Sequence, residues 1–316
     1  MPQSFDAIVI GAGQSGPFLA ARLAEAGWKT ALIERTHLGG TCVNDGCTPT
    51  KTLVASARAA WIARRAADFG VMLEGGVSVD MQAVKARKDR VVGASVKSLN
   101  DWLRNMENLT VFDGEGSFVS ASEVEVDGEV LAAPRIFINT GARPQVPDWP
   151  GIETVPYLTN TTMMDVDFLP EHLVIAGASY IGLEFAQMYR RFGSKVTVID
   201  RGKLPAPRED AEISEAILDI LEAEGVEFVF ETRDVRVENT GEGVRLSLTA
   251  GGESRTIEGS HLLLALGRTP NTDALNLPAA GLLANAKGFI EVDDHLRTSV
   301  PGIWAMGDVN GRGAFT

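Results

Sequence analysis

The feature that most constrains this chain is a unit of strand, glycine-rich turn, helix and second strand that occurs twice. In the first copy, an apolar stretch over residues 5–10 leads into a Gly-x-Gly-x-x-Gly turn, a helical pattern that Gly27 ends, and a strand over residues 30–33 closed by Glu34. This order of elements is typical of a dinucleotide-binding βαβ unit. We therefore expect the chain to form a parallel sheet that binds a nucleotide at its glycine-rich turn.

Each part of the first turn has a physical role in such a unit. Gly11 makes the tight turn, Gly13 lets the backbone approach a pyrophosphate, and Gly16 permits close packing of helix against strand. The start of the helix offers N–H groups to the phosphates, and Glu34 can accept hydrogen bonds from a ribose. A glycine-rich structural turn is the alternative, and the acid at the right distance favours nucleotide binding.

The second copy occupies residues 173–200. Its turn carries Gly177, Ser179 and Gly182, and its second strand ends at Asp200. Ser179 replaces the middle glycine with another small residue. Two copies predict two nucleotides, a resident flavin dinucleotide (FAD) and a visiting nicotinamide nucleotide, NAD(P)H. One functional copy beside one relic is the alternative.

The helical patterns predict which side chains face the core. In the first helix these are Leu19, Leu23 and Ala26. In the second they are Ile181, Phe185, Met188 and Phe192.

The fold class predicted is α/β, with two Rossmann-like dinucleotide-binding domains and small antiparallel β insertions. Short strands are expected over residues 109–139, with turns at Asp113-Gly114 and Asp127-Gly128, and over residues 228–248. We expect a discontinuous FAD-binding domain over residues 1–150 and 286–316, and an NAD(P)-binding domain over residues 151–285.

Charge and hydropathy restrict the partners. The formal net charge of −13 argues against nucleic acid and anionic membranes, because phosphates would be repelled. No apolar run approaches the length of a membrane span, and the N-terminus lacks the pattern of a signal peptide. A cytoplasmic location is the expectation.

The chain's two cysteines, Cys42 and Cys47, lie close together in the segment GGTCVNDGCTPTK. A zinc site would need further ligands at suitable spacing, which the sequence lacks, and a thioredoxin motif would need Cys-x-x-Cys. A redox-active disulfide and a pair of inert thiols remain. Cys47 precedes an expected helix that Thr48 caps and Pro49 begins, and a helix N-terminus favours a thiolate.

This segment resembles the signature of the pyridine nucleotide-disulfide oxidoreductases, the group of glutathione reductase, dihydrolipoamide dehydrogenase and mercuric reductase. Further motifs match in family order over essentially the whole chain, and the core is most similar to mercuric reductase. These motifs are Gly11 to Glu34, Thr140-Gly141, Gly177 to Asp200, Gly267-Arg268-Thr269-Pro270 and Gly307-Asp308.

The resemblance implies a catalytic set. Cys42 would be the interchange thiol that meets the acceptor, and Cys47 the thiol against the flavin. Lys51 would approach flavin N5 and pair with Glu184, and Tyr180 would gate the nicotinamide pocket. Tyr180 and Glu184 are four residues apart in a helical segment, so they share a face.

The resemblance also implies the residues that contact the cofactors, with Asp308 on the ribityl chain of the FAD. In addition to the two glycine turns and their acids, these are Gly40, Thr41, Thr140, Gly141, Arg201, Gly267, Arg268 and Asp308. No metal ligand is implied.

Two positions depart from the family pattern. Asp45 replaces an apolar residue between the cysteines, where a carboxylate disfavours a nearby thiolate and repels anionic substrates. Asp200 favours NADH, because a carboxylate repels a 2′-phosphate, whereas Arg201 and Arg208 are cations of the kind that hold one. The choice between NADH and NADPH stays open.

The implied activity is an NAD(P)H-dependent oxidoreductase that passes electrons through FAD to a Cys42–Cys47 disulfide and then to a small-molecule or metal-ion acceptor. The family continues into a dimerisation domain of about a hundred residues. The sequence stops at Thr316, so we expect this domain to be absent here and the longer parent to be a homodimer. A flavin-binding fragment or non-enzymatic flavoprotein is the alternative. Low-molecular-weight thioredoxin reductase fits less well, because its Cys-x-x-Cys lies in the nicotinamide domain.

Overall fold

The computed structural model describes residues 1–313, which divide into two compact units. Unit 1 comprises residues 1–48, 91–143 and the chain from Arg268 onward, and unit 2 comprises residues 49–90 and 144–267. These units differ from the expected ranges in two ways: residues 49–90 belong to unit 2, and the later boundaries lie at residues 143/144 and 267/268 and not at 150/151 and 285/286. The later boundaries differ because β18 (Arg268–Pro270) pairs with β9 (Ala142–Pro144), and Leu277 packs into the core of unit 1. Which cofactor each unit holds stays a prediction.

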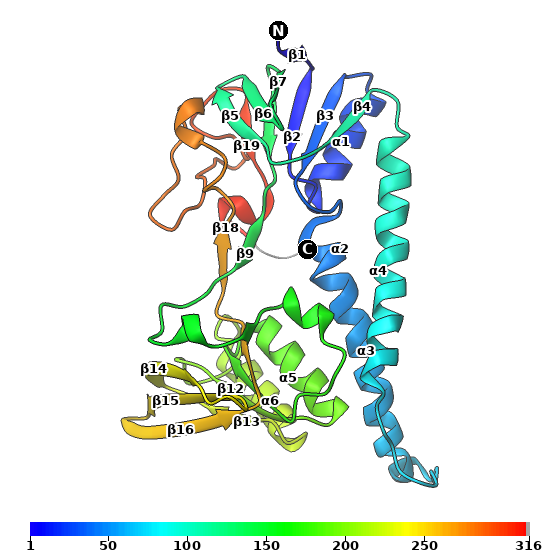
Figure 1. The fold of residues 1–316 in the computed structure, drawn as a ribbon, viewed down its shortest axis with the longest axis vertical. Helices are drawn as coiled ribbons and strands as arrows, with labels where there is room; N and C mark the ends of the chain where they lie inside the picture. The colour runs from blue at the N-terminus through cyan, green and yellow to red at the C-terminus, as the bar shows by residue number, and fades with distance from the viewer. Residues whose placement is uncertain (314–316) are drawn as a thin grey trace. The chain divides into compact units, whose positions relative to one another are not determined.

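Unit 1 is built on a parallel sheet in the order β19–β8–β2–β3–β4 (Figure 1). Its strands are β2 (Ala7–Ile10), β3 (Thr30–Glu34), β4 (Leu109–Asp113), β8 (Ile136–Ile138) and β19 (Ile303–Ala305). A second sheet has the order β1–β7–β6–β5, with β1 (Gln3–Ser4), β5 (Ser117–Ser120), β6 (Glu123–Val126) and β7 (Glu129–Ala132). The strands β5 to β7 pair antiparallel, as the predicted insertion requires.

Successive side chains on the strands of unit 1 point to opposite faces of the sheet, and the two faces contribute to two separate cores. Ile8 and Ile10 pack in one cluster with Phe118 of the antiparallel sheet, whereas Val9 packs in the other with α1 (Ser15–Glu25). The expectation for α1 was wrong in detail. Its buried residues are Gly16, Pro17, Ala20, Ala21 and Ala24. Small side chains let this helix approach the sheet closely, and Leu19 and Leu23 are left at the rim, half-buried.

Unit 2 repeats the same plan with a parallel sheet in the order β10–β17–β11–β12–β13. Its strands are β10 (Tyr157–Leu158), β11 (His172–Ala176), β12 (Lys195–Ile199), β13 (Glu227–Val229) and β17 (His261–Leu264). An antiparallel sheet, drawn in yellow in Figure 1, consists of β14 (Thr232–Asn239), β15 (Val244–Ala250) and β16 (Glu253–Gly259). The α/β class with parallel sheets and antiparallel insertions is confirmed.

The β11 strand of unit 2 also feeds two cores. Leu173 and Ile175 pack with α5 (Tyr180–Phe192), and Val174 and Ala176 pack with the antiparallel sheet. The predicted core residues Phe185, Met188 and Phe192 are buried. Ile181 is not, since 38% of it is exposed in the first turn of the helix.

The remaining helices are α2 (Gly40–Asn44), α3 (Cys47–Arg64), α4 (Met81–Arg104) and α6 (Ala211–Ala223). Short 3-10 turns occur at η1 (Ala66–Phe69), η2 (Ile152–Thr154), η3 (Thr162–Asp165), η4 (Leu277–Ala280) and η5 (Gly307–Asn310). Over residues 1–313, none of the helices has both the length and the apolar character to span a bilayer.

Candidate active site

The first glycine turn requires glycine for steric reasons. Gly11 follows β2 with a φ of +98°, and a side-chain Cβ there would lie 2.4 Å from the carbonyl oxygen of Asn139. A Cβ on Gly16 would lie 2.2 Å from the carbonyl oxygen of Gly11. Both distances are far below van der Waals contact, so the backbone around this turn is packed as closely as a dinucleotide loop demands.

The acid at the end of β3 folds back onto this turn. Ala12 N–H donates to Oε2 of Glu34 at 2.7 Å, and Thr36 N–H donates to Oε1 at 2.9 Å. Thr36 Oγ1 also donates to Oε1 at 3.0 Å, so the second lone pair of Oε2 is the one that can accept from a ribose hydroxyl. The carboxylate therefore holds the shape of the turn in addition to its predicted role in binding.

The second glycine turn, in unit 2, has matching geometry. Gly177 follows β11 with a φ of +111°, and a Cβ there would lie 2.3 Å from the carbonyl oxygen of Ala265. A Cβ on Gly182 would lie 1.9 Å from the carbonyl oxygen of Gly177. Ser179 is the N-cap residue of α5 with extended backbone, so the serine is accommodated without a change of plan.

Asp200 in unit 2, like Glu34 in unit 1, accepts a hydrogen bond from a backbone N–H of its glycine turn. Its Oδ2 accepts from Ala178 N–H at 2.8 Å, and its Oδ1 accepts from Gly202 N–H at 2.7 Å. The neighbouring Arg201 is exposed. Asp200 and Arg201 thus lie at the edge of this turn, as the sequence indicates. This arrangement is compatible with both NADH and NADPH.

Both turns lie where the strand order of their sheet reverses. In unit 1 the chain leaves β2 and continues to β3 on one side, while β8 flanks β2 on the other. In unit 2, β11 has β12 and β17 as the corresponding neighbours. Ligands of open α/β sheets bind at such switch points, outside the carboxyl ends of the strands.

Asn139 is a central residue of unit 1 that sequence reasoning did not assign a role. Only 5% of it is exposed. Its Oδ1 accepts from Gly16 N–H at 2.9 Å, and its Nδ2 donates to the carbonyl of Met306 at 3.0 Å. One amide thus joins the glycine turn to the Gly307-Asp308 motif. Its position just before Thr140-Gly141 was the available signal.

Thr140 and Gly141 are fixed by reciprocal hydrogen bonds to Asn271. Thr140 Oγ1 donates to the carbonyl of Asn271 at 2.8 Å, and Asn271 Nδ2 donates to the carbonyl of Thr140 at 2.9 Å. Asn271 N–H also donates to the carbonyl of Gly141. The Thr-Gly and Arg-Thr-Pro-Asn motifs, which are far apart in sequence, are therefore neighbours in unit 1.

The cysteine segment is seated on the first glycine turn. Gly39 N–H donates to the carbonyl of Ala12 at 2.9 Å, and a Cβ on Gly40 would lie 2.7 Å from the Cα of Gly13. The left-handed φ of +96° at Gly39 and +55° at Gly40 makes this approach possible. Anything bound along the glycine turn would therefore lie near α2, which carries Cys42.

The two cysteines lie on successive helices, and both residues belong to unit 1 although α3 continues into unit 2. Cys42 is in the middle of α2, and Cys47 is the first residue of α3 rather than the residue before it. A Cβ on Gly46 would lie 3.3 Å from the Cα of Cys42, so the chain folds back tightly between the two. Both cysteines are half-buried.

A half-buried charge pair in unit 1, Arg268 and Asp308, fits a polar ligand. The Nε of Arg268 lies 3.4 Å from Oδ2 of Asp308, and its Nη2 donates to the carbonyl of Ala142 and approaches Oγ1 of Thr41 at 3.4 Å. Burial lowers the pKa of Arg268 and raises the pKa of Asp308. Among residues 1–313, the buried Arg268 Nε has no hydrogen-bond acceptor. This unmatched donor is what a phosphate or hydroxyl of a dinucleotide would satisfy.

The ion pair implied by the resemblance is present in unit 2. Lys51 Nζ donates to Oε1 of Glu184, with 62% and 35% of the two side chains exposed. Tyr180 stands one turn before Glu184 on α5, and its hydroxyl donates to Oε1 of Glu209. Glu209 was not identified from the sequence, since no motif indicates which acid in the Arg208-Glu209-Asp210 run would meet Tyr180.

Two other observations bear on the site. The described residues contain no cluster of three or more His, Cys, Asp or Glu side chains suited to a metal ion.

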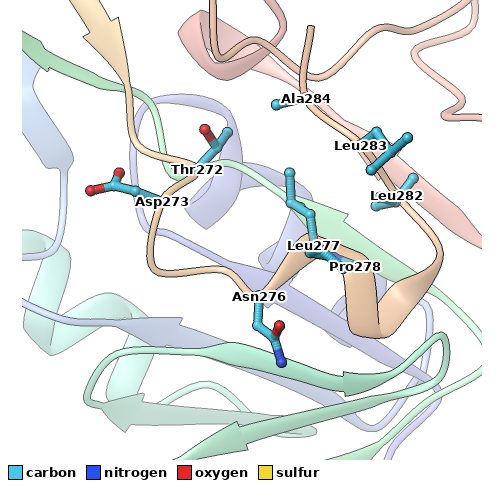
Figure 2. Close-up of a pocket in the computed structure, with 8 residues that line it drawn as sticks. All are labelled: Thr272, Asp273, Asn276, Leu277, Pro278, Leu282, Leu283 and Ala284. Atoms are coloured by element: carbon cyan, nitrogen blue, oxygen red, sulfur yellow. The ribbon is translucent and has the colours of Figure 1, made fainter.

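A pocket of about 380 Å³ in unit 1, shown in Figure 2, contains none of the predicted site residues. It is lined by Thr272, Asp273, Asn276, Leu277, Pro278, Leu282, Leu283 and Ala284.

The chain thus contains two glycine-turn units with matching acids and a pair of closely spaced cysteines, a combination typical of dinucleotide-dependent oxidoreductases. The chain belongs to the pyridine nucleotide-disulphide oxidoreductase family, whose sequence profile matches residues 5–315.

The relatives that this chain resembles are named for different enzymatic activities. It is 37% identical to a dihydrolipoyl dehydrogenase of Chlamydia trachomatis, over 99% of this chain and 67% of the relative. It is also 37% identical to a mercuric reductase of Lysinibacillus sphaericus, over 97% of this chain and 56% of the relative. The solved structure of a Cu(II) complex of the HOCl-induced flavoprotein disulfide reductase RclA from Escherichia coli matches with a TM-score of 0.88 and 36% identity, over 100% of this chain and 68% of that one.

Proposed function

We propose that the chain is the nucleotide-binding core of an NAD(P)H-dependent FAD disulfide oxidoreductase. The observation that carries the proposal is the repetition of one glycine turn, with the same backbone-bound acid, at the switch point of two separate parallel sheets. Unit 1 would hold FAD, because its turn also supports the cysteine segment. Unit 2 would hold NAD(P)H.

The residues of unit 1 divide the binding of FAD among them. The turn of Gly11, Gly13 and Gly16 would take the pyrophosphate, and Glu34 the ribose. Gly40 and Thr41 border the same turn, and Thr140 and Gly141 lie at the neighbouring strand end. Arg268 and Asp308 supply a charged donor and an acceptor for polar atoms of the flavin moiety. Bound FAD supplies a centre that takes a hydride from NAD(P)H and gives two electrons to a disulfide.

The protein's own chemistry would then be thiol–disulfide exchange. Two electrons and two protons convert the Cys42–Cys47 disulfide to two thiols, and the Cys42 thiolate attacks a disulfide acceptor, forming a mixed disulfide with one of its sulfurs and releasing the other as a thiol. Cys47 closes the cycle by displacing the product and forming the disulfide again. Lys51 and Glu184 would provide a charge pair beside the flavin, and Gly267 would border the nicotinamide side.

The proposed acceptor is a small-molecule disulfide or a metal ion. Asp45 places a carboxylate between the cysteines, which disfavours anionic acceptors such as glutathione-like disulfides. Relatives named dihydrolipoyl dehydrogenase and mercuric reductase, and a flavoprotein disulfide reductase solved as a Cu(II) complex, support this range. We also propose that the parent protein is a cytoplasmic homodimer. The most specific form of the proposal is that this core functions like that of a mercuric reductase.

An anaerobic titration of the purified protein with NADH and with NADPH tests the proposal. We expect yellow protein with FAD bound, reduction by at least one nucleotide, and a long-wavelength absorbance band at the two-electron stage from the Cys47 thiolate beside the flavin. Cys47→Ser should abolish that band while retaining FAD, and Cys42→Ser, the matched control, should retain the band.

Two outcomes would contradict the proposal. A colourless protein that cannot be reconstituted with FAD would overturn it entirely. FAD bound without reduction by either nucleotide would instead establish a non-enzymatic flavin-binding chain.

A further inference from the structure

The inference concerns the segment between β12 and α6 in unit 2, which folds over the second glycine turn. Ala206 N–H donates to the carbonyl of Ala178 at 2.8 Å, inside the turn itself. Ala206 is 1% exposed and has a left-handed φ of +47°, an uncommon conformation for alanine. Ser214 Oγ donates to the carbonyl of Ala206 at 3.3 Å. The segment is thus fastened to the place where a pyrophosphate would bind.

Glu209 projects from this fastened segment toward the start of α5. Its N–H donates to the carbonyl of Ala206 at 2.9 Å, and its Oε1 accepts the hydroxyl hydrogen of Tyr180 at 2.5 Å. Tyr180 is the first residue of α5, directly after the glycine turn. The hydrogen bond therefore joins the segment between β12 and α6 to the N-terminal end of α5. The same bond is the main cause of a raised pKa of Tyr180.

We propose that Glu209 is a positioning residue that latches Tyr180 across the nicotinamide nucleotide site, and that the nucleotide must open this latch to bind. The inference rests on the proposed binding of NAD(P)H by unit 2. The pyrophosphate is anionic and is drawn to the N-terminal N–H groups of α5. A carboxylate at the same helix end repels it, so nucleotide and latched Glu209 exclude each other. Entry of the nucleotide frees the tyrosine ring to move.

The test measures binding, not turnover. The full chain is titrated with NADH and with NADPH by calorimetry, and the association rate is followed by the fluorescence of the reduced nucleotide. We expect Glu209→Ala, which removes both the charge and the acceptor, to lower the dissociation constant by about threefold to tenfold, mainly through faster association, since an exposed hydrogen bond of this kind is modest in strength. Glu209→Gln removes the charge but keeps an amide oxygen that can accept from the Tyr180 hydroxyl, so it should lower the constant by less. Glu212→Gln is the matched control, because it removes an equal charge from the first turn of α6 and should change the constant by less than about twofold.

A double-mutant cycle separates the latch from simple charge repulsion. In a Tyr180→Phe background the hydroxyl is gone, so Glu209→Ala should lower the dissociation constant by less than it does in the wild-type background. An equally large effect in both backgrounds would show charge repulsion without a latch and overturn the inference. Unchanged binding in Glu209→Ala would also overturn it while leaving the proposed function intact. Failure of wild-type protein and all variants to bind either nucleotide would overturn both.

Discussion

Replacement of Asn139 by alanine is the sharpest test of how unit 1 is held together. The side-chain amide is buried and makes two hydrogen bonds of 2.9 Å and 3.0 Å, to Gly16 N–H and to the carbonyl of Met306. Its removal leaves a donor and an acceptor unsatisfied in the interior, at a cost of about 1–3 kcal/mol each. We therefore expect Asn139→Ala to lower the free energy of unfolding of unit 1 by about 2–5 kcal/mol.

The measurement should report on unit 1 separately, because a chain with two units need not unfold in one step. Hydrogen exchange followed by mass spectrometry does so, and peptides that contain Gly16 and Met306 should lose protection while those from α5 keep it. Asn139→Asp keeps an acceptor for Gly16 but sets a second oxygen against the Met306 carbonyl, so it should also be destabilised. Asn105→Ala is the control, since the Asn105 amide donates to Asp101 at the surface.

A loss of under about 1 kcal/mol in Asn139→Ala, with unchanged protection around Gly16, would refute this reasoning. It would mean that the glycine turn and the Gly307-Asp308 motif are fixed by the surrounding backbone alone. FAD affinity gives a second readout, because the same amide orders the turn that would bind the pyrophosphate.

Three further changes have defined outcomes. Lys51→Ala should alter the free energy of unfolding by less than about 1 kcal/mol, because its ion pair with Glu184 is exposed, yet slow the reduction of bound flavin in stopped-flow measurements with FAD content retained. Gly182→Ala should abolish NAD(P)H binding in calorimetry without loss of FAD, since its Cβ would lie 1.9 Å from the carbonyl oxygen of Gly177. Burial lowers the pKa of His172, so the native state binds a proton less readily than the unfolded chain, and the stability of unit 2 should fall as the pH drops below the usual 6.5 of histidine. His172→Gln should reduce that fall in thermal melts at about pH 7.5 and pH 5.5, and an unchanged pH dependence would contradict this assignment.

The fold was predictable because its determinants are local in sequence. Each strand, glycine turn, helix and terminal acid follows the last within about thirty residues, and this order identifies a βαβ unit. The helix faces were less predictable. The pattern of large apolar residues indicated Leu19 and Leu23, but Ala20 and Ala24 are the buried residues of α1. Small residues give no hydrophobic signal, although they are what close packing against a sheet requires.

The site was predictable where a motif is contiguous and not where it depends on distant contacts. The loop of Cys42 and Cys47 could be recognised, but its α2 helix could not, because it depends on left-handed glycines packed against the first turn. Asn139 and Glu209 are ordinary polar residues in sequence. Their partners lie 123 and 29 positions away, and only the folded chain shows the pairing.

The backbone hydrogen bonds of Asp200 have a consequence for anyone who wishes to redesign coenzyme preference. Exchanging this acid for a neutral or basic residue is the obvious route to an enzyme that accepts a 2′-phosphate. Here the same oxygen atoms also restrain Ala178 N–H and Gly202 N–H. A substitution that removes them would release these two backbone N–H groups together with the carboxylate that is proposed to select the coenzyme. Conversion would therefore need a compensating acceptor near Ala178, such as a side-chain amide, before any gain in tolerance for the phosphate could be seen.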